Sequence, residues 1–265
     1  MAEVRATDFV DPQARAFYVQ TMAALTAAQV PFMVGGAYAF ARYTAIERHT
    51  KDLDIFVLPD DACRTLEVLA AEGFTCDMTF PHWLGKAHRG EDFVDVIFSS
   101  GNAVARVDTQ WFDHARRDKV LDQDVLLVPP EEMVWSKAFI MERERFDGAD
   151  VAHVLRACAD ELDWSRLVRR FGDHFRVLLS HLILFGFIYP GEQSKIPGPV
   201  MVHLLDRLRR DRHAQKSMCK GTLLSRQQYL TDIDRWELAD ARLEERWMSR
   251  EDIAHWTAAI DKHGR

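Results

Sequence analysis

The sequence predicts an α+β protein, with strands and helices in its first half and an all-helical second half. Short apolar runs bounded by glycine and proline recur before residue 128 and indicate strands between helices. The pair Pro129-Pro130 then interrupts the chain, and the apolar residues beyond it recur at helical spacing. Since 265 residues exceed one average domain, we expect two domains, residues 1–128 and residues 129–265.

The elements of the first half follow from local composition. Residues 11–29 are rich in alanine, and Phe17, Met22 and Leu25 lie at near-helical spacing within them. The expected strands are short, largely apolar stretches, and several of them end at glycine or proline. The expected strands are 31–34, 53–58, 74–80, 83–87, 93–98 and 125–128, and the expected helices are 11–29, 37–43, 60–71 and 109–117.

The second half begins with Glu131 and Glu132, acids that favour the first turn of a helix because they complement its dipole. Its longest apolar run, Leu182–Tyr189, is far shorter than the roughly 20 residues that a membrane span requires. We therefore expect no membrane partner. The expected helices are 133–145, 149–159, 165–187, 200–210, 226–234 and 250–262.

Charge is distributed unevenly between the two halves. Residues 1–130 hold 19 acids and 12 bases, whereas residues 131–265 hold 22 of each, so the net charge of −7 lies entirely in the first half. This balance argues against a globally basic nucleic-acid coat protein, although a local basic patch stays possible. The four scattered cysteines form no C-x-x-C pair and are typical of reduced thiols, so we expect a cytoplasmic protein.

The glycine pair Gly35-Gly36 lies between a predicted strand and a predicted helix. Two glycines at this position let backbone N–H groups approach a phosphate closely, beside the positive end of the helix dipole. The pair fits neither a P-loop nor a dinucleotide-binding turn, and a plain turn is the alternative. The following segment Arg48-His49-Thr50 offers a base and a hydroxyl that could contact triphosphate oxygens or neutralise nearby acids.

Three carboxylates interrupt two otherwise apolar strands. Asp52 and Asp54 alternate with Leu53 and Ile55, so both acids face the same way, about 7 Å apart. Asp95 stands alone in an apolar strand, where an isolated buried charge would cost several kcal/mol. The alternatives without a functional role are a solvated edge strand for Asp52 and Asp54 and a protonated or hydrogen-bonded core aspartate for Asp95. If the strands are neighbours, the three acids share one face and a divalent cation can compensate their charge.

The order Gly35-Gly36, then Asp52-Leu-Asp54-Ile, then Asp95 resembles the pattern of the DNA polymerase β-type nucleotidyltransferase superfamily. The resemblance covers residues 18–100 and implies the polymerase β-like fold, a mixed sheet flanked by helices. The spacer between Gly36 and Asp52 is slightly longer than in the commonest members. That length favours the bacterial AbiEii/MenT-like or orphan minimal nucleotidyltransferase branch.

The resemblance implies a role for each residue of the pattern. Asp52 and Asp54 would hold Mg²⁺ on the phosphates of a nucleoside triphosphate, with ATP the expected one. Asp95 would complete a second metal site and help to deprotonate an acceptor hydroxyl. The nucleotide-binding residues would be Gly35, Gly36, Arg48, Thr50 and Lys137.

The second half adds a segment similar to a helix pair of the same branch, formed by Glu131, Lys137 and the acids Asp147 and Asp150. There Lys137 would reach the triphosphate, while Asp147 or Asp150 would fix the helices or line the site. The alternative is a charged helix surface with pairs of opposite charge one turn apart.

The expected reaction moves a nucleotide onto an acceptor hydroxyl of RNA or protein, as in toxin–antitoxin relatives, and releases pyrophosphate. Residues 206–226 carry seven bases and two acids, and this stretch could guide a polyanionic acceptor. Two alternatives stay open. The chain could be a small-molecule adenylyltransferase of the antibiotic type, or a catalytically idle nucleotide-binding module that acts as an antitoxin or binds a partner.

Overall fold

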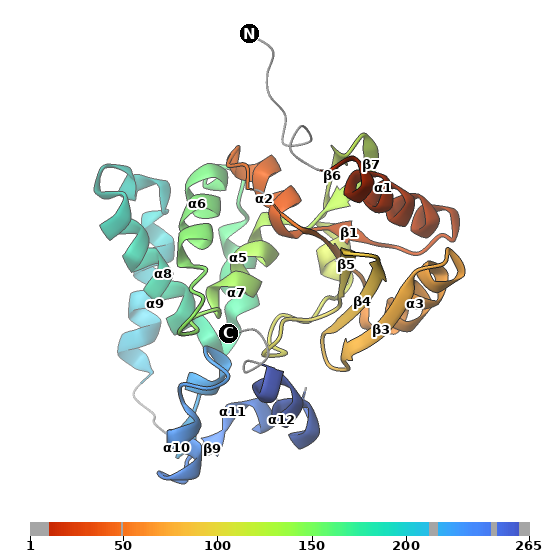
Figure 1. Ribbon diagram of the computed structural model, residues 1–265. Coiled ribbons are helices and arrows are strands. Elements are labelled where there is room, and N and C mark those ends of the chain that lie inside the picture. The colour runs from red at the N-terminus through yellow and green to blue at the C-terminus, as the bar shows by residue number, and fades with distance from the viewer. Residues whose placement is uncertain (1–10, 49, 212–216, 245–247, 260–265) are drawn as a thin grey trace. The chain divides into compact units, whose positions relative to one another are not determined.

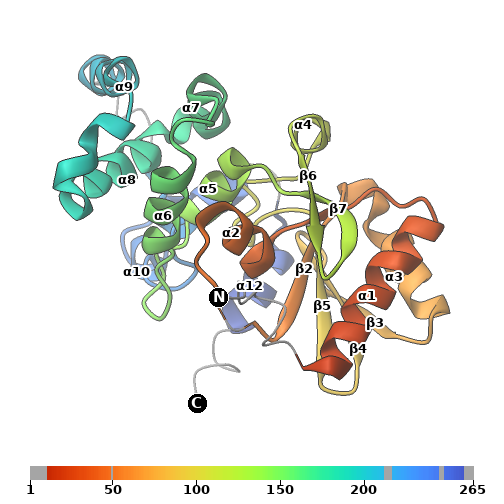
Figure 2. The same cartoon turned by 90° about the horizontal axis from the view of Figure 1, so that it is seen from above.

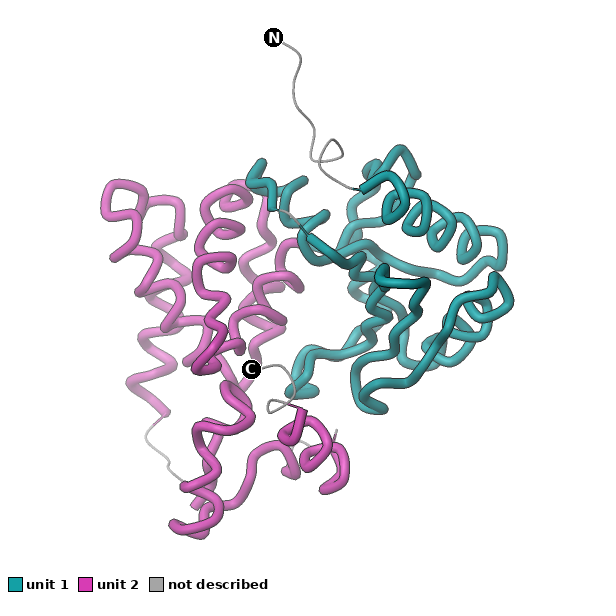
Figure 3. Tube along the Cα trace, viewed as in Figure 1, with its two compact units in different colours: residues 1–129 teal, residues 130–265 magenta. Residues whose placement is uncertain are grey.

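The structure is a computed structural model, and it describes residues 11–48, 50–211, 217–244 and 248–259. The chain divides into two compact units, Met1–Pro129 and Pro130–Arg265, which Figure 3 distinguishes by colour. His49, the middle residues of the predicted basic stretch (212–216) and the end of the last predicted helix lie outside the described residues. The two units are described separately below.

Unit 1 is built on a seven-stranded mixed sheet (Figure 1), in the order β3-β4-β5-β2-β1-β7-β6. Strand β2 is parallel to β5 and β1 is parallel to β7, whereas the other neighbours are antiparallel. The predicted α+β class is therefore confirmed. The strands are β1 (Met33–Val34), β2 (Asp52–Phe56), β3 (Thr75–Phe80), β4 (Leu84–Arg89), β5 (Asp92–Ile97), β6 (Arg116–Val120) and β7 (Gln123–Leu127).

Helices cover both faces of this sheet, as Figure 2 shows. Helices α1 (Pro12–Ala27) and α3 (Ala62–Ala71) pack against each other on one face. Helix α2 (Gly36–Thr44) packs on β2 from the other face. Asp11 caps α1 because its side chain accepts hydrogen bonds from the first backbone N–H groups of the helix. The fully buried residues of β2 and β5 form the core beneath α1 and α3: Leu53, Ile55, Val94 and Val96.

The edge strand β6 differs from the sequence prediction. A helix was expected over residues 109–117, but α4 (Thr109–Asp113) is short and β6 begins at Arg116. Leu121 and Asp122 both have positive φ angles, 49° and 65°, which form the two-residue turn between β6 and β7. The turn contains no glycine, the usual sequence signal for a tight turn. The charged side chains of the edge strand β6 also hide the alternation of apolar and polar residues that would indicate a strand.

The described residues of unit 2 are mainly helical, with one short strand pair and an isolated bridge between Met141 and Phe146. The helix predicted over 133–145 ends at Ala138, because the chain turns back so that the Asp147 N–H donates to the carbonyl of Ile140. The two-residue strands β8 (Met218–Cys219) and β9 (Ala239–Asp240) pair in parallel and were not predicted. The helices are α5 (Pro130–Ala138), α6 (Gly148–Cys158), α7 (Trp164–Phe171), α8 (Phe175–Ile188), α9 (Gly198–Arg210), α10 (Leu230–Asp234), α11 (Ala241–Glu244) and α12 (Arg250–Ala258).

The helix predicted over 165–187 is divided at Gly172, whose φ angle is 45°. The segment Trp164–Ile188 is nevertheless 25 residues long and contains an 18-residue window with a mean hydropathy of 1.3, so by length and composition alone it could cross a membrane. Within unit 2 it contains Arg166, whose buried guanidinium pairs with Glu131 and Glu132 of α5. The segment thus contributes to the core of this unit.

Candidate active site

Three aspartates converge on the α2 face of the sheet in unit 1. Asp52 and Asp54 lie on β2, Asp95 lies on the neighbouring parallel strand β5, and Asp54 is directly opposite Asp95 in the register. One carboxylate oxygen of each residue lies within 4.8 Å of the others. The structure therefore brings together the three acids that the sequence predicted to share one face.

The local pattern of the two strands explains this convergence. The apolar neighbours of the acids are completely buried beneath α1 and α3, and strand alternation then turns the acids to the opposite face. Like charges directly opposite each other destabilise a sheet, so the arrangement requires a compensating charge. Carboxylate oxygens are the ligands that Mg²⁺ prefers, and the donor set of Asp52, Asp54 and Asp95 fits a divalent cation of this kind.

Thr50 orients the first of these acids. Its hydroxyl donates to Oδ1 of Asp52 over 2.5 Å. The residue predicted to contact the nucleotide thus holds a metal-ligand candidate in place. The other predicted residue of this loop, Arg48, stacks its guanidinium on the ring of Phe40 in α2, 4.5 Å from the ring centroid.

The glycine pair makes room for the acids. Gly36 has a φ angle of 52°, and a Cβ atom placed there would lie only 1.7 Å from Oδ2 of Asp54. A Cβ atom on Gly35 would lie 2.3 Å from the ring of Phe56. Side chains are therefore excluded at both positions, because the start of α2 lies directly against β2. This close approach is a separate reason for the glycines beside the predicted contact with phosphate.

Lys86 is a further site residue, which the sequence motifs did not identify. It lies on β4 directly opposite Asp95, and its Nζ is 2.5 Å from Oδ1 of that carboxylate. Burial raises the pKa of the Asp95 carboxyl above its ordinary value, and the Lys86 ammonium opposes this rise. A positive charge is thus built into the acidic cluster.

Tyr38 adds a buried hydroxyl near the cluster. It lies in the first turns of α2, is 9 % exposed, and its hydroxyl has no hydrogen-bond partner among the described residues. Burial, and then the charge of Asp52, raise the pKa of Tyr38 to about 12. The phenol is therefore neutral at physiological pH and can act as a hydrogen-bond donor.

Lys137 belongs to unit 2, where α5 carries it. Its Nζ lies 3.0 Å from Oδ2 of Asp147 and 2.8 Å from Oδ2 of Asp150. Arg145 completes this cluster with two hydrogen bonds to Asp147. Lys137, which the resemblance linked to the triphosphate, thus pairs with Asp147 and Asp150, the acids that were expected to fix the helices or line the site.

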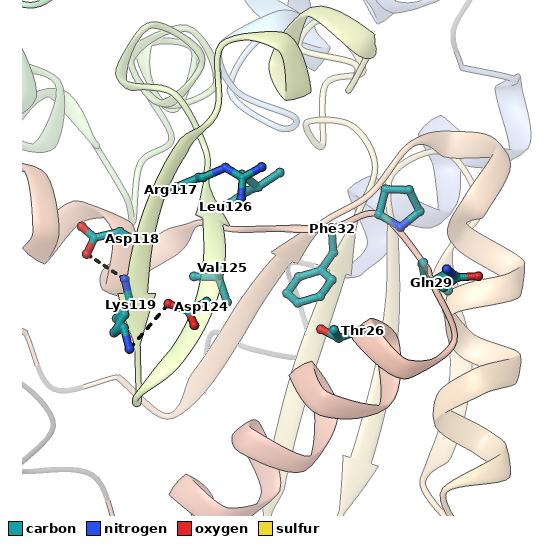
Figure 4. Close-up of a pocket in the computed structure, with 11 residues that line it drawn as sticks. Thr26, Gln29, Phe32, Arg117, Asp118, Lys119, Asp124, Val125 and Leu126 are labelled. Carbon is teal, nitrogen blue, oxygen red and sulfur yellow. Dashed lines mark hydrogen bonds and ion pairs between the residues drawn. The ribbon is translucent and has the colours of Figure 1, made fainter.

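A cavity of about 710 Å³ lies elsewhere in unit 1, at the β6 edge of the sheet (Figure 4). Its lining includes Arg117, Lys119 and the residue between them, Asp118, which also pairs with Arg42 of α2. Thr26 of α1 borders the same cavity, and none of the three aspartates does. None of the residues predicted for the site lines this cavity. The lining residues are Thr26, Gln29, Val30, Pro31, Phe32, Arg117, Asp118, Lys119, Asp124, Val125 and Leu126.

Several solved structures are similar to this chain at low sequence identity. The solution structure of the antibiotic-resistance factor ANT(2'')-Ia has a TM-score of 0.47 at 14% identity, and covers 65% of this chain and 96% of that one. A crystal structure of ANT(2'')-Ia in complex with adenylyl-2''-tobramycin has a TM-score of 0.41 at 13% identity, and the match covers 74% of this chain and 99% of that one. The lincosamide antibiotic adenylyltransferase LnuA, bound to lincomycin, has a TM-score of 0.39 at 12% identity, and covers 55% and 96%.

No curated protein matches the sequence. Residues 13–174, which are more than half of the chain and include all three aspartates, match the model of a family described as uncharacterised nucleotidyltransferase. The chain therefore belongs to this nucleotidyltransferase family.

Proposed function

We propose that the chain is a Mg²⁺-dependent enzyme that moves a nucleotidyl group from ATP to an acceptor hydroxyl of RNA or protein. The observation that carries this proposal is the convergence of Asp52, Asp54 and Asp95 on one face of the sheet, with carboxylate oxygens within 4.8 Å of one another. Acids of this kind are typical of sites that bind a divalent cation and polarise phosphate oxygens. Membership of a nucleotidyltransferase family supports the reaction class.

In this proposal each residue of unit 1 has a defined task. Asp52, held by Thr50, and Asp54 are the ligands for a divalent cation, which when bound supplies positive charge to the phosphates. Asp95 accepts the proton of the acceptor hydroxyl. The hydroxyl oxygen then bonds to the α-phosphorus, and the bond from this phosphorus to the bridging oxygen breaks, so that pyrophosphate leaves.

The proposal extends to the branch and the place of action. The spacing from Gly36 to Asp52 supports the AbiEii/MenT-like or orphan branch. The four cysteines, all within the part of the chain that the structure describes, form no disulfide, which is compatible with a reducing cytoplasm. A toxin–antitoxin role would follow from this branch. These finer assignments stay predictions.

The acceptor is less narrowly defined than the reaction. Several bases of α9 and its surroundings are already paired with acids: Arg207 with Asp173 at 2.9 Å, and Arg209 with Asp206 at 3.3 Å. This pairing reduces the charge available to attract RNA. Protein is therefore the acceptor we favour, with RNA and a small hydroxylated molecule as the other outcomes of the experiment.

An idle binding module is the rival from another class. It would have little use for three carboxylates that repel each other, since a nucleotide carries negative charge itself. The retention of all three acids on one face thus favours catalysis.

The test incubates the purified chain with Mg²⁺, cell extract and nucleoside triphosphates labelled at the α-phosphate. We expect label to appear in protein, and to disappear with Asp52→Asn and Asp95→Asn. The matched control is Asp124→Asn, which removes an exposed carboxylate of the same sheet and should leave transfer within twofold. Circular dichroism confirms that each variant is folded.

The outcomes separate the hypotheses. Label in RNA or in a small molecule would change the acceptor and keep the reaction. Absence of transfer by the wild-type chain, with nucleotide binding that Asp52→Asn leaves unchanged, would contradict the enzymatic proposal and favour the idle module.

A further inference from the structure

Helices α8 and α9 of unit 2 present large apolar side chains to solvent. Phe187 on α8 is 84 % exposed, the largest fraction among the large apolar residues that the structure describes. Successive helical residues turn by about 100°, so the exposed apolar residues of each helix form one strip along its surface. We call these seven residues the apolar stripe: Ile183, Leu184, Phe187, Ile188, Val202, Leu205 and Leu208.

The two parts of the stripe lie on the same side of the helix pair. Arg207 in the last turn of α9 pairs with Asp173, just before α8, at 2.9 Å, and Arg176 at the start of α8 pairs with Asp211, just after α9. The helices, which pack side by side in Figure 1, are therefore antiparallel. Seen along one axis, antiparallel helices turn in opposite senses. Since each part of the stripe follows the contact side of its own helix in the direction of rotation, both parts face the same way.

Helix α9 gains little from the core of unit 2. Leu204 is the single buried residue among the 13 described residues of this helix. Most helical stability in proteins comes from burial of an apolar face against another element. The exposed Val202, Leu205 and Leu208 thus form a face that the unit itself does not cover.

The size of the stripe matches one side of a protein interface. With about 200 Å² for a fully exposed large apolar residue, exposed fractions of 38 % to 84 % give on the order of 700 Å². The largest apolar patch of a typical monomer is roughly 300–600 Å². A stable interface buries about 800 Å² on each partner. The stripe is therefore large for a free surface and close to half of a dimer interface.

The charges around the stripe favour a protein over a lipid surface or a polyanion. Besides the two pairs described above, Arg209 pairs with Asp206 at 3.3 Å, and Arg156 pairs with Glu192 at 2.8 Å. Binding to anionic lipid depends on basic side chains that attract the head groups, and these guanidinium groups are already paired with acids. A second copy of the chain requires no net charge, because an apolar surface is complementary to itself across a two-fold axis.

We propose that the apolar stripe of α8 and α9 binds a second copy of this chain in a two-fold symmetric dimer. The stripe of one subunit contacts the stripe of the other, and Phe187 contributes the largest contact area because it is the most exposed member. The dimer does not depend on the proposed function, since the stripe contains none of the residues assigned to the reaction.

Sedimentation equilibrium of the full chain, measured from about 1 to about 100 μM, tests the proposal. We expect the wild-type chain to reach twice its mass of 30.6 kDa at the upper concentrations. Phe187→Asp introduces a charge into the stripe and should weaken association about 100-fold. Val202→Asp tests the α9 part of the stripe in the same way, and keeps the proposal testable if Phe187→Asp fails to fold.

The matched control is Trp236→Asp. It replaces an apolar side chain of unit 2 that is 67 % exposed but lies outside the stripe, so it should leave the dimer intact. Circular dichroism confirms that each variant is folded. A further arm mixes the wild-type chain with vesicles of phosphatidylcholine and phosphatidylserine, and we expect no binding.

The outcomes separate the possible occupants of the stripe. A monomeric wild-type chain at about 100 μM would overturn the proposal. A dimer that both Phe187→Asp and Val202→Asp leave intact would also overturn it, because another surface would then hold the subunits together. Vesicle binding by a monomeric chain, abolished in Phe187→Asp, would assign the stripe to a membrane instead. A dimer without label transfer in the separate assay would contradict only the proposed function.

Discussion

The carboxylates of unit 1 and those of unit 2 solve the problem of buried charge in opposite ways. In unit 2, Glu131 and Glu132 on α5 are buried, and Arg166 on α7 donates to both of them. Arg170 on the same helix adds a hydrogen bond of 2.8 Å to Glu132. In unit 1, Asp52, Asp54 and Asp95 are turned toward one another. One set of acids joins two helices, and the other concentrates negative charge.

The difference shows how a structural cluster can be told from a functional one. Acids that serve packing are matched by guanidinium groups of the same unit, which offset the loss of hydration. The three acids of unit 1 outnumber the Lys86 ammonium that contacts Asp95, so their remaining negative charge requires compensation, and a bound cation can supply it. The three predictions below test this distinction, beginning with the buried acids of unit 2, which are paired with arginine.

Removal of Arg166 should give the largest effect on stability. Arg166→Met leaves Glu131 and Glu132 buried without their main partner, and breaking a buried ion pair in this way costs about 3–5 kcal/mol. The measurement is the free energy of unfolding in urea. Arg209→Met is the control, because this side chain is 79 % exposed and its loss should change the value by less than about 0.5 kcal/mol. Similar values for both variants would show that the pairing in unit 2 is incidental.

A comparison of two glycines tests the crowding in unit 1. Gly36 and Gly90 both have positive φ angles, 52° and 63°, but a Cβ atom meets Asp54 at Gly36 and nothing within 4 Å at Gly90. Gly36→Ala should therefore displace Asp54 and lower nucleotidyl transfer about 100-fold, since a shift of about 1 Å in a site is enough for this. Gly90→Ala should cost only the backbone strain of roughly 1–2 kcal/mol in stability.

The readout for the glycine pair is the initial rate of transfer, with the melting temperature as a check on folding. Equal loss of activity in both variants would mean that strain alone matters. The site would then not depend on the space that Gly36 leaves for Asp54.

A buried histidine of unit 2 gives the smallest effect, and it depends on pH. Burial lowers the pKa of His181, which donates from Nε2 to the carbonyl of Ala138 at 2.8 Å. The unfolded chain binds a proton near pH 6.5 and the folded chain does not, so acidification below that value favours unfolding. The free energy of unfolding should fall by up to about 1.4 kcal/mol per pH unit from this residue.

The measurement is the free energy of unfolding in urea at pH 7.5 and at pH 5.5. The loss between these two pH values is then compared between variants. His181→Gln keeps a donor for Ala138 and should reduce the loss at low pH. His203→Gln alters an exposed histidine of α9 and should leave the loss as in the wild-type chain. An unchanged loss in His181→Gln would show that other groups dominate the acid response.

Strand alternation is the reason that the three aspartates could be predicted from sequence. Leu53 and Ile55 must face the core, and this requirement alone sets the direction of Asp52 and Asp54. The same reasoning applies to Asp95. The α+β class followed from similar local patterns, which apolar burial enforces.

Lys86 and β6 depended on information that local patterns do not contain. Lys86 becomes a site residue only through its register with Asp95, which the turn at Gly90 determines. The strands 84–89 and 92–97 could have been aligned around that glycine, which was the available signal. No comparable signal existed for β6, because its turn consists of Leu121 and Asp122 and charged side chains dominate the strand.

The parallel pairing of β2 with β5 also has a consequence for folding. Helix α3 and the strands β3 and β4 separate these two strands along the chain, so Asp54 and Asp95 meet only after this crossover has formed. The repulsion between the acids is therefore absent from the unfolded chain and arises as the native sheet closes. A cation that binds them recognises the folded unit alone, and every such binding event draws the folding equilibrium toward the native state.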